Sequence, residues 1–157
     1  MDLYAEYEPA MRAAICQAVL ARRLDEVPVG AVVVQGGRVI AAAHNRRTLD
    51  GDPTAHAEML AIRDAAKAVG DWRLTGCTMV VTLEPCCMCA GAMVLARMDR
   101  LVYGAADPKA GAADTLYQLC GDRRLNHRLE VISGVLADQC AGLLGEFFRE
   151  QRAKGKK

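Results

Sequence analysis

Aromatic residues, excess charge and long apolar runs are all scarce in this sequence of 157 residues. Although 52% of the residues are hydrophobic, no apolar run approaches the ~20 residues of a membrane-spanning helix. The first residues, Met1 to Tyr4, do not resemble a signal peptide. We therefore expect a cytoplasmic protein that does not enter a membrane. The length is typical of one domain and permits a real core, so residues 1–157 are expected to form a single domain.

The formal net charge of +1 gives no sign of a polyanionic partner in the bulk composition. Basic residues nevertheless cluster locally, and each cluster alone is typical of a solvated face. Together they could follow a short RNA backbone if folding brings them to one side. These clusters are Arg22-Arg23, Arg46-Arg47, Arg123-Arg124 with Arg128, and residues 149–157. With aromatic residues at 4%, we expect base stacking only from Phe147, Phe148 or Tyr117, and core packing of at least one phenylalanine.

Helical and strand patterns are distributed along the whole chain. The expected helices span residues 3–23, 56–69, 86–96 and 137 to about 152. The expected strands span residues 29–34, 38–43, 78–83, 100–105 and about 129–135, the first two joined by a Gly36-Gly37 hairpin. Alternation of helices and strands implies parallel pairing with right-handed crossovers. We predict an α/β fold, a three-layer α/β/α sandwich with a five-stranded mixed sheet, whose strand order the pattern leaves open.

Two segments lie outside this alternation. Residues 106–128 are rich in Gly, Asp and basic residues and are interpreted as a crossover with a short helix at 113–120. Residues from about 150 to 157 are expected to form a basic C-terminal tail.

The seven cysteines are an odd number and favour reduced thiols and a metal over a disulfide framework. Four stand among apolar neighbours and are expected in the core: Cys16, Cys77, Cys120 and Cys140. The other three crowd into a predicted strand-to-helix junction. On a helix, Cys86 and Cys89 lie roughly 60° apart, whereas Cys87 and Cys89 lie roughly 200° apart. We therefore assign Cys86 and Cys89 as metal ligands and Cys87 to packing.

His56 and Glu58 are predicted to complete this site from a second helix start. Asp52-Pro53-Thr54 precedes them, and an apolar helical stripe follows, so both fall in the first turn. First-turn side chains tilt toward the helix N-terminus and can converge on a point beyond it. One His and two Cys hold zinc with a fourth position open for water, a catalytic pattern, and Glu58 can handle that water's protons. A structural zinc site and a redox dithiol are the alternatives, but neither accounts for all of these residues.

At this point the sequence resembles a known family, the zinc-dependent nucleoside and nucleobase deaminases, whose signature pairs H-x-E with P-C-x-x-C. The resemblance extends over nearly the whole chain, and the segments that flank the metal motif resemble the branch that acts on tRNA. The resembling segments are Pro28-Val29-Gly30-Ala31, His44-Asn45, Asp52 to Glu58, Thr82 to Met93, Gly104-Ala105, Lys109-x-Gly111-Ala112, Asn126-His127-Arg128 and Phe147-Phe148-Arg149.

The resemblance implies a cytidine-deaminase-like fold and one Zn2+ held by His56, Cys86 and Cys89, with Glu58 as the proton carrier. It implies conversion of adenosine to inosine at the wobble position of a tRNA anticodon, in an arginine tRNA stem-loop. Asn45, Pro28 and Val29 are then substrate contacts, and the loop of Asp107 touches RNA. Asp114 departs from relatives, which often have a small residue there. Relatives act as homodimers, and Ala90, Gly91 and Ala92 are small enough for close helix packing, between subunits or within one.

Two other functions stay open on sequence grounds. A free nucleobase deaminase acting on guanine or cytosine would share the zinc site and differ in the C-terminal helix and the loop after Ala105. The second function is of a different class: the chain could be a non-catalytic, zinc-stabilised RNA-binding module. Glu58 argues against that function, because an acid beside an open zinc position has no structural purpose.

Asn45 also has an alternative role. It could simply cap a turn instead of contacting the substrate.

Overall fold

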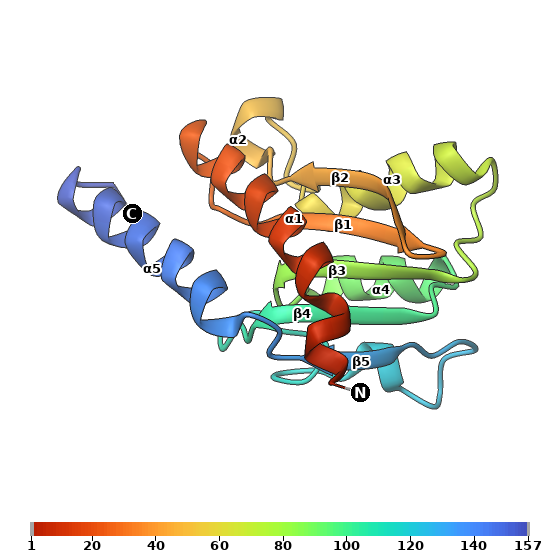
Figure 1. Cartoon of the computed structure of the whole chain (residues 1–157). Helices are drawn as coiled ribbons and strands as arrows, with labels where there is room; N and C mark the ends of the chain where they lie inside the picture. The colour runs from red at the N-terminus through yellow and green to blue at the C-terminus, as the bar shows by residue number, and fades with distance from the viewer. Residues whose placement is uncertain (1, 157) are drawn as a thin grey trace.

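The computed structural model describes residues 2–156 and contains a five-stranded sheet between two layers of helices (Figure 1). The strands are β1 (Gly30–Gln35), β2 (Arg38–His44), β3 (Cys77–Leu83), β4 (Arg100–Ala105) and β5 (Glu130–Ser133), in the order β2-β1-β3-β4-β5. β1 pairs antiparallel with β2 and β3, whereas β4 runs parallel to β3 and β5. The predicted mixed sheet and three-layer sandwich are confirmed, and the strand order is now known.

Helices α1 (Leu3–Arg23) and α5 (Ala137–Ala153) cover one face of the sheet, and α1 crosses the front of it in Figure 1. The core beneath them is formed by Met11, Ala14, Val32, Val80, Val102, Val135 and Cys140. Gly30 lets α1 come close to β1, because a Cβ at that position would lie 1.9 Å from the carbonyl oxygen of Ala14. The apolar residues Tyr7, Met11, Ala14 and Ala18, which recur on α1 at helical spacing, are therefore core.

Helices α3 (Ala57–Val69) and α4 (Cys87–Leu95) cover the opposite face. Side chains alternate along a strand, so Val81 of β3 packs under these two helices while Val80 packs under α1 and α5. β3 is central and is buried on both faces along six of its seven residues. The carboxyl end of this central strand leads directly into α4, which fixes the place of the cysteines.

The predicted helix at residues 113–120 does not form. Residues 106–129 contain turns and, as their regular element, a short 3-10 helix η1 (Leu119–Gly121). The i→i−4 ladder of a helix is absent, because the N–H groups of Leu116 and Tyr117 donate to the Gly111 carbonyl and that of Leu119 donates to the Ala112 carbonyl. The N–H groups of Ala113, Asp114 and Thr115 donate to the carboxylate of Glu84. A four-residue helix after β2, α2 (Arg47–Asp50), was not predicted, and it ends at Gly51 in the left-handed conformation.

One expectation about the core cysteines needs correction, and the C-terminal helix ends about where it was expected to end. Cys16 is exposed on α1, whereas Cys77, Cys120 and Cys140 are buried as expected. α5 continues to Ala153, close to the expected helix end at about residue 152, so the first residues of the expected basic tail are helical. Within that last part of α5, Gln151 is buried and donates to the Asp25 carboxylate at 2.8 Å. The C-terminal segment is thus docked against the turn that follows α1.

The aromatic side chains divide between core and surface. Phe147 is buried and Phe148 is 43% exposed, so the expectation that at least one phenylalanine packs in the core is confirmed. Tyr117 is exposed as expected. Trp72 and Tyr4 are exposed as well, so the predicted set of three aromatic residues for base stacking was incomplete. Among the described helices, none has both the length and the apolar composition that crossing a bilayer requires.

Candidate active site

Two helix starts meet at the carboxyl end of β3. His56 is the N-cap of α3, and Cys86 is the N-cap of α4; both have extended backbone conformations and no side-chain capping bond. Their side chains are therefore free to point past the helix ends, as the sequence predicts. The positive ends of two helix dipoles face the same point, which favours anionic sulfur there.

Three potential metal-ligating atoms converge at this point. Nδ1 of His56 lies 3.6 Å from Sγ of Cys86 and 3.6 Å from Sγ of Cys89. All three atoms lie within 4.8 Å of one another. A tetrahedral zinc with bonds of about 2.1 Å to nitrogen and about 2.3 Å to sulfur separates those ligand atoms by about 3.6 Å. The donor set and its spacing thus fit a zinc ion.

Cys87 lies outside this cluster. It is exposed on the first turn of α4, although it was expected to pack against the core. The helix rotation that separates Cys87 from Cys89 is therefore present, but it turns Cys87 to the surface rather than to the interior. An apolar neighbourhood in sequence gives no information on which side of α4 is covered.

The thiols of the cluster ionise unequally. A hydrogen bond from Cys89, aided by His56, lowers the pKa of Cys86 to about 4. The hydrogen bond to Cys86, together with burial, raises the pKa of Cys89. The hydrogen bond with Cys86 also raises the pKa of His56. One sulfur is therefore already an anion, and a divalent cation between the side chains would displace the proton of the other.

Glu58 stands in the first turn of α3, two residues after His56, with 4% of its surface exposed. Burial raises the pKa of its carboxyl group above the ordinary value for Glu. A carboxyl group with a raised pKa can hold a proton and release it nearer neutral pH than a solvated one. Glu58 lines the same pocket as His56 and Cys86, so this group faces the space where a substrate would lie.

The pocket over the cluster has a volume of about 210 Å³. Three of the four expected substrate contacts line it, namely Val29, Asn45 and Asp107. Pro28 is buried and is not among the lining residues. The remaining wall comes from Val27, Arg47, Ala57, Leu83, Glu84 and Ala110. Arg47 belongs to the predicted Arg46-Arg47 cluster and Ala110 to the loop of Asp107 that was expected to touch RNA, but neither was predicted as a residue of the pocket wall.

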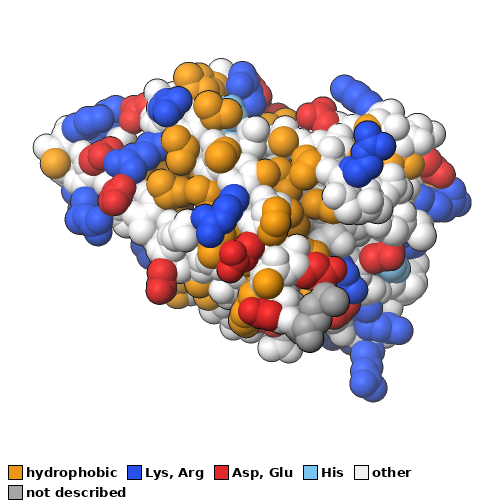
Figure 2. Space-filling view, viewed as in Figure 1, with side chains coloured by type: hydrophobic (Ala, Val, Ile, Leu, Met, Phe, Trp, Pro, Cys, Tyr) orange, Lys and Arg blue, Asp and Glu red, His pale blue; other side chains and the backbone are white. Residues whose placement is uncertain are grey.

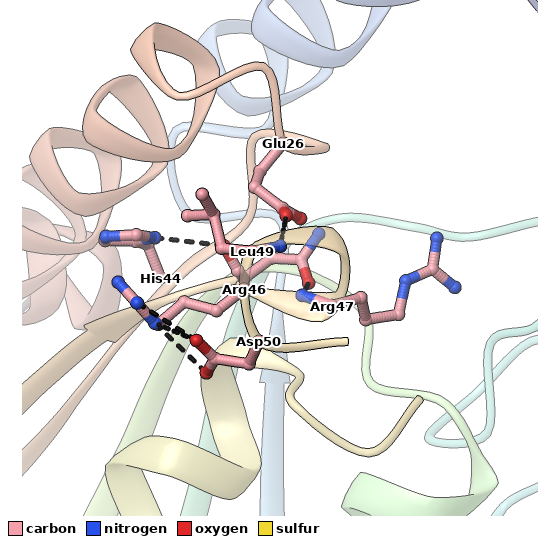
Figure 3. A network of polar contacts seen from close by, with 7 residues as sticks. Glu26, His44, Arg46, Arg47, Leu49 and Asp50 are labelled. Carbon is pink, nitrogen blue, oxygen red and sulfur yellow. Dashed lines mark hydrogen bonds and ion pairs between the residues drawn. The ribbon is translucent and has the colours of Figure 1, made fainter. Parts of the chain in front are cut away.

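Asn45 has two backbone partners as well as its place in the pocket wall. Its Nδ2 donates to the Val27 carbonyl at 3.2 Å, and its Oδ1 accepts from the Arg47 N–H at 3.1 Å. Both expected roles, pocket wall and turn cap, are thus compatible with its position. The neighbouring polar network ties α2 in place, with the buried Glu26 accepting from the Leu49 N–H at 2.7 Å and Arg46 paired with Asp50 (Figure 3).

A second hollow of about 730 Å³ adjoins the pocket and shares four of its lining residues: Val27, Arg47, Leu83 and Asp107. α5 forms its far side with Phe147 and Phe148, and Lys109 and Lys156 also line it. Along α5, cationic and anionic side chains are interleaved (Figure 2), and Arg22 pairs with both Glu146 and Glu150.

The basic clusters do not all reach this side of the molecule. Arg124 pairs with Asp122, and the loop that carries it is fixed by His127, whose ring nitrogen Nε2 lies 2.7 Å from the Met98 carbonyl oxygen. Met98 precedes β4, so this loop lies where that strand begins, whereas the pocket lies where β3 ends. The expectation that all clusters could follow one RNA backbone is therefore wrong for Arg123, Arg124 and Arg128.

Comparison with known proteins is consistent with this geometry. Residues 5–152 match the model of the MafB19-like deaminase family. The chain is 53% identical over 146 residues to the tRNA-specific adenosine deaminase of Bacillus subtilis (strain 168), covering 93% of this chain and 91% of the relative. It is 46% identical over 150 residues to the tRNA-specific adenosine deaminase of Haemophilus influenzae, covering 95% and 87%.

Solved structures of deaminases also superpose on this chain. A structure from a study of A-to-I editing by tRNA:A34 deaminases at the wobble position superposes with a TM-score of 0.82 at 46% identity, covering 85% of this chain and 97% of that one. A guanine deaminase from Nitrosomonas europaea superposes with a TM-score of 0.78 at 26% identity, covering 89% and 83%. The fold is therefore shared by deaminases that differ in substrate.

Proposed function

This chain belongs to the tRNA-specific adenosine deaminases, and we propose that it converts adenosine to inosine by hydrolysis at the wobble position of a tRNA anticodon. Ammonia is the second product. The observation that carries the proposal is the convergence of His56, Cys86 and Cys89 beside the buried carboxyl group of Glu58. A base with an exocyclic amine is the substrate class that this combination of groups deaminates in the zinc-dependent family.

We propose one Zn2+ per chain, held by His56, Cys86 and Cys89. The 3.6 Å separations between His56 and both sulfurs support this assignment, as does the lowered pKa of Cys86. When bound, zinc supplies Lewis acidity that makes water ionise near neutral pH. Three protein ligands are the number typical of catalytic zinc sites, whereas structural sites have four.

Glu58 is assigned as the general acid and base. Its carboxylate takes a proton from the water that attacks carbon 6 of adenine. It delivers this proton to the ring nitrogen, then takes the proton of the hydroxyl group now bound to carbon 6 and passes it to the departing amine, so that the carbon–nitrogen bond breaks and ammonia leaves. The raised pKa of Glu58 suits both proton uptake and proton delivery, because the carboxyl group must hold each proton between the two events.

The pocket walls are assigned to substrate recognition. Val29 supplies an apolar surface for the base, Asn45 a polar contact from the turn before α2, and Asp107 a polar contact from the loop after β4. Pro28 acts from behind this wall, since it is buried next to Val29. A base reaches such a pocket only when it is out of its stack, and a hairpin-loop nucleotide costs less to extrude than a paired one.

The RNA is assigned as an anticodon stem-loop, in particular that of an arginine tRNA. Arg47 lies between the pocket and the second hollow and could contact the phosphate beside the reacting nucleotide. Phe148 is exposed at the second hollow and offers a stacking surface there. Because the proposed substrate is tRNA, we also propose that the enzyme acts in the cytoplasm.

We assign a homodimer formed through the outer face of α4. This helix carries no charged residue, and Cys87, Gly91 and Leu95 recur on it at intervals of four. Leu95 is 69% exposed, and a Cβ at Gly91 would meet no atom within 4 Å, so the face is open in the single chain. Ala90, in contrast, is buried within the chain and serves intramolecular packing.

The test of this function is a comparison of substrates for the purified chain. The substrates are an arginine-tRNA anticodon stem-loop with adenosine at the wobble position, free guanine, free cytosine and free adenosine. We expect ammonia from the stem-loop alone. Ammonia from guanine or cytosine alone would replace the proposal with a free nucleobase deaminase. Bound zinc with no ammonia from any substrate would indicate the RNA-binding module.

A further inference from the structure

Glu84 is a buried carboxylate that the proposed chemistry does not use. It follows β3 and precedes Pro85, and only 2% of its surface is exposed. Five donors of one loop point at its two oxygens: the N–H groups of Asp107 (3.1 Å), Ala113 (3.2 Å), Asp114 (2.9 Å) and Thr115 (3.0 Å), and the Thr115 hydroxyl (2.5 Å). In the described part of the chain, no cationic side chain forms an ion pair with it. Its charge is therefore compensated by the loop.

The loop held in this way forms part of the substrate pocket. Asp107 and Ala110 line the pocket, and Asp107 is bonded directly to Glu84. The Asp107 carboxylate in turn accepts from the N–H groups of Lys109 (3.0 Å) and Ala110 (3.2 Å). Hydrogen bonds to the carboxylates of Glu84 and Asp107 thus connect the end of β3 to the pocket wall at Ala110.

The fit between Glu84 and the loop is also steric. A Cβ at Gly111 would lie 2.4–2.5 Å from the carboxylate atoms of Glu84. A contact that short is not tolerated, so any side chain at Gly111 must displace either the carboxylate or the loop. The Glu84 carboxylate and the loop can therefore keep their present positions only if residue 111 is glycine.

We propose that Glu84 is a positioning residue for substrate binding, which holds residues 107–115 as a preformed wall of the pocket. The proposal rests on the proposed function, since it assigns the loop to that pocket. A loop that is already ordered loses little entropy when the substrate binds, so the interaction appears in affinity rather than in the chemical step. Glu84 also leads into Cys86, and a role in holding the metal ligands is the competing explanation.

Glu84→Gln separates these explanations while keeping the size of the side chain. The new NH2 group faces N–H donors and cannot accept from them, so two of the five bonds to the loop are lost if it replaces Oε1 and three if it replaces Oε2. We expect amide hydrogen exchange to accelerate about tenfold at residues 107, 113, 114 and 115, with no change at Ala90, whose N–H bonds within α4. The KM for the stem-loop should rise about tenfold, with kcat within about twofold and zinc content unchanged.

A second pair of variants tests the steric requirement. Gly111→Ala should raise the KM and accelerate exchange at the same amides, and Glu84→Asp in that background should restore part of both, because the shorter side chain makes room for the methyl group. Gly142→Ala is the matched control, since a Cβ there meets no atom within 4 Å, and it should change neither quantity.

Unchanged amide exchange in Glu84→Gln would overturn the proposal whatever the activity. Loss of zinc, or a fall in kcat at constant KM, would overturn it in favour of a role at the metal ligands. Failure of the proposed function gives a different result, because the unaltered protein would then form no inosine on the stem-loop. The comparison of amide exchange between the unaltered protein and Glu84→Gln would still test whether Glu84 orders the loop.

Discussion

The Nδ1 atom of His56 lies 3.6 Å from the Sγ atom of Cys89, although the two residues are 33 positions apart in the sequence. They meet because α3 and α4 start at the same end of the sheet and each helix directs its first residues toward that end. The site is therefore a property of two helix starts, and it depends on the sheet that aligns them.

Metal binding is expected to require Cys86 and Cys89 and to be independent of Cys87. Cys86→Ser and Cys89→Ser should each lose most of the bound zinc, because a hydroxyl is a poor substitute for a thiolate ligand. Cys87→Ser should keep about one zinc per chain, since this side chain is exposed and outside the cluster. Atomic absorption on the purified variants measures the content. Loss of zinc from Cys87→Ser would show that the ligand assignment is wrong.

Glu58→Gln should keep the zinc and lose turnover. The amide cannot accept the proton of water, and general acid–base catalysis contributes about 10²–10⁴-fold to rates. We expect kcat to fall by at least about 10²-fold on the stem-loop, with KM changed little. The measurement is single-turnover inosine formation with zinc content determined on the same sample. A variant that retained zinc and normal turnover would remove Glu58 from the mechanism.

Arg47 is expected to contribute to RNA affinity through charge. Arg47→Ala should weaken stem-loop binding at low salt and reduce the slope of log K against log salt by about one. Arg124→Ala is the matched control, since Arg124 is paired with Asp122 at the opposite end of the sheet, and it should leave the slope unchanged. Fluorescence anisotropy over a range of salt concentrations measures both. Equal effects of the two variants would indicate that the RNA does not pass Arg47.

The outer face of α4 is expected to hold two chains together. Leu95→Lys places a charge at the most exposed apolar position of that face and should convert dimers to monomers in sedimentation velocity. Leu20→Lys is the control, because Leu20 is also an exposed leucine but lies on α1, and it should leave the dimer intact. A dimer that survives Leu95→Lys and dissociates in Leu20→Lys would move the interface to α1.

Much of the site followed from local geometry that the sequence carries. The spacing of Cys86 and Cys89 on a helix, and the placing of His56 at a helix start, both depend on neighbours within one or two turns. The separation of these residues from Cys87 followed from the same rotation. The direction in which Cys87 points did not, because it depends on which side of α4 the rest of the chain covers.

Other features depend on contacts between distant segments and could not be predicted. The antiparallel pairing of β1 with β3 places the hairpin beside the central strand, and no residue of either strand specifies that neighbour. In place of the expected helix at 113–120, the N–H groups of Ala113, Asp114 and Thr115 donate to Glu84, about thirty residues earlier, and local propensity gives no information on such a distant partner. A single glutamate before Pro85 is part of no sequence pattern that would indicate its role as an acceptor for this loop.

The most direct test of the proposed function is the position of inosine in full-length tRNA. An arginine tRNA with adenosine at the wobble position is incubated with the zinc-loaded protein, digested with nucleases and analysed by mass spectrometry, beside the same tRNA with guanosine at that position. We predict inosine at the wobble position of the first tRNA and none in the second. Inosine at other adenosines of both tRNAs, or in neither tRNA while zinc is bound, would contradict the assignment of this chain as a wobble-position deaminase.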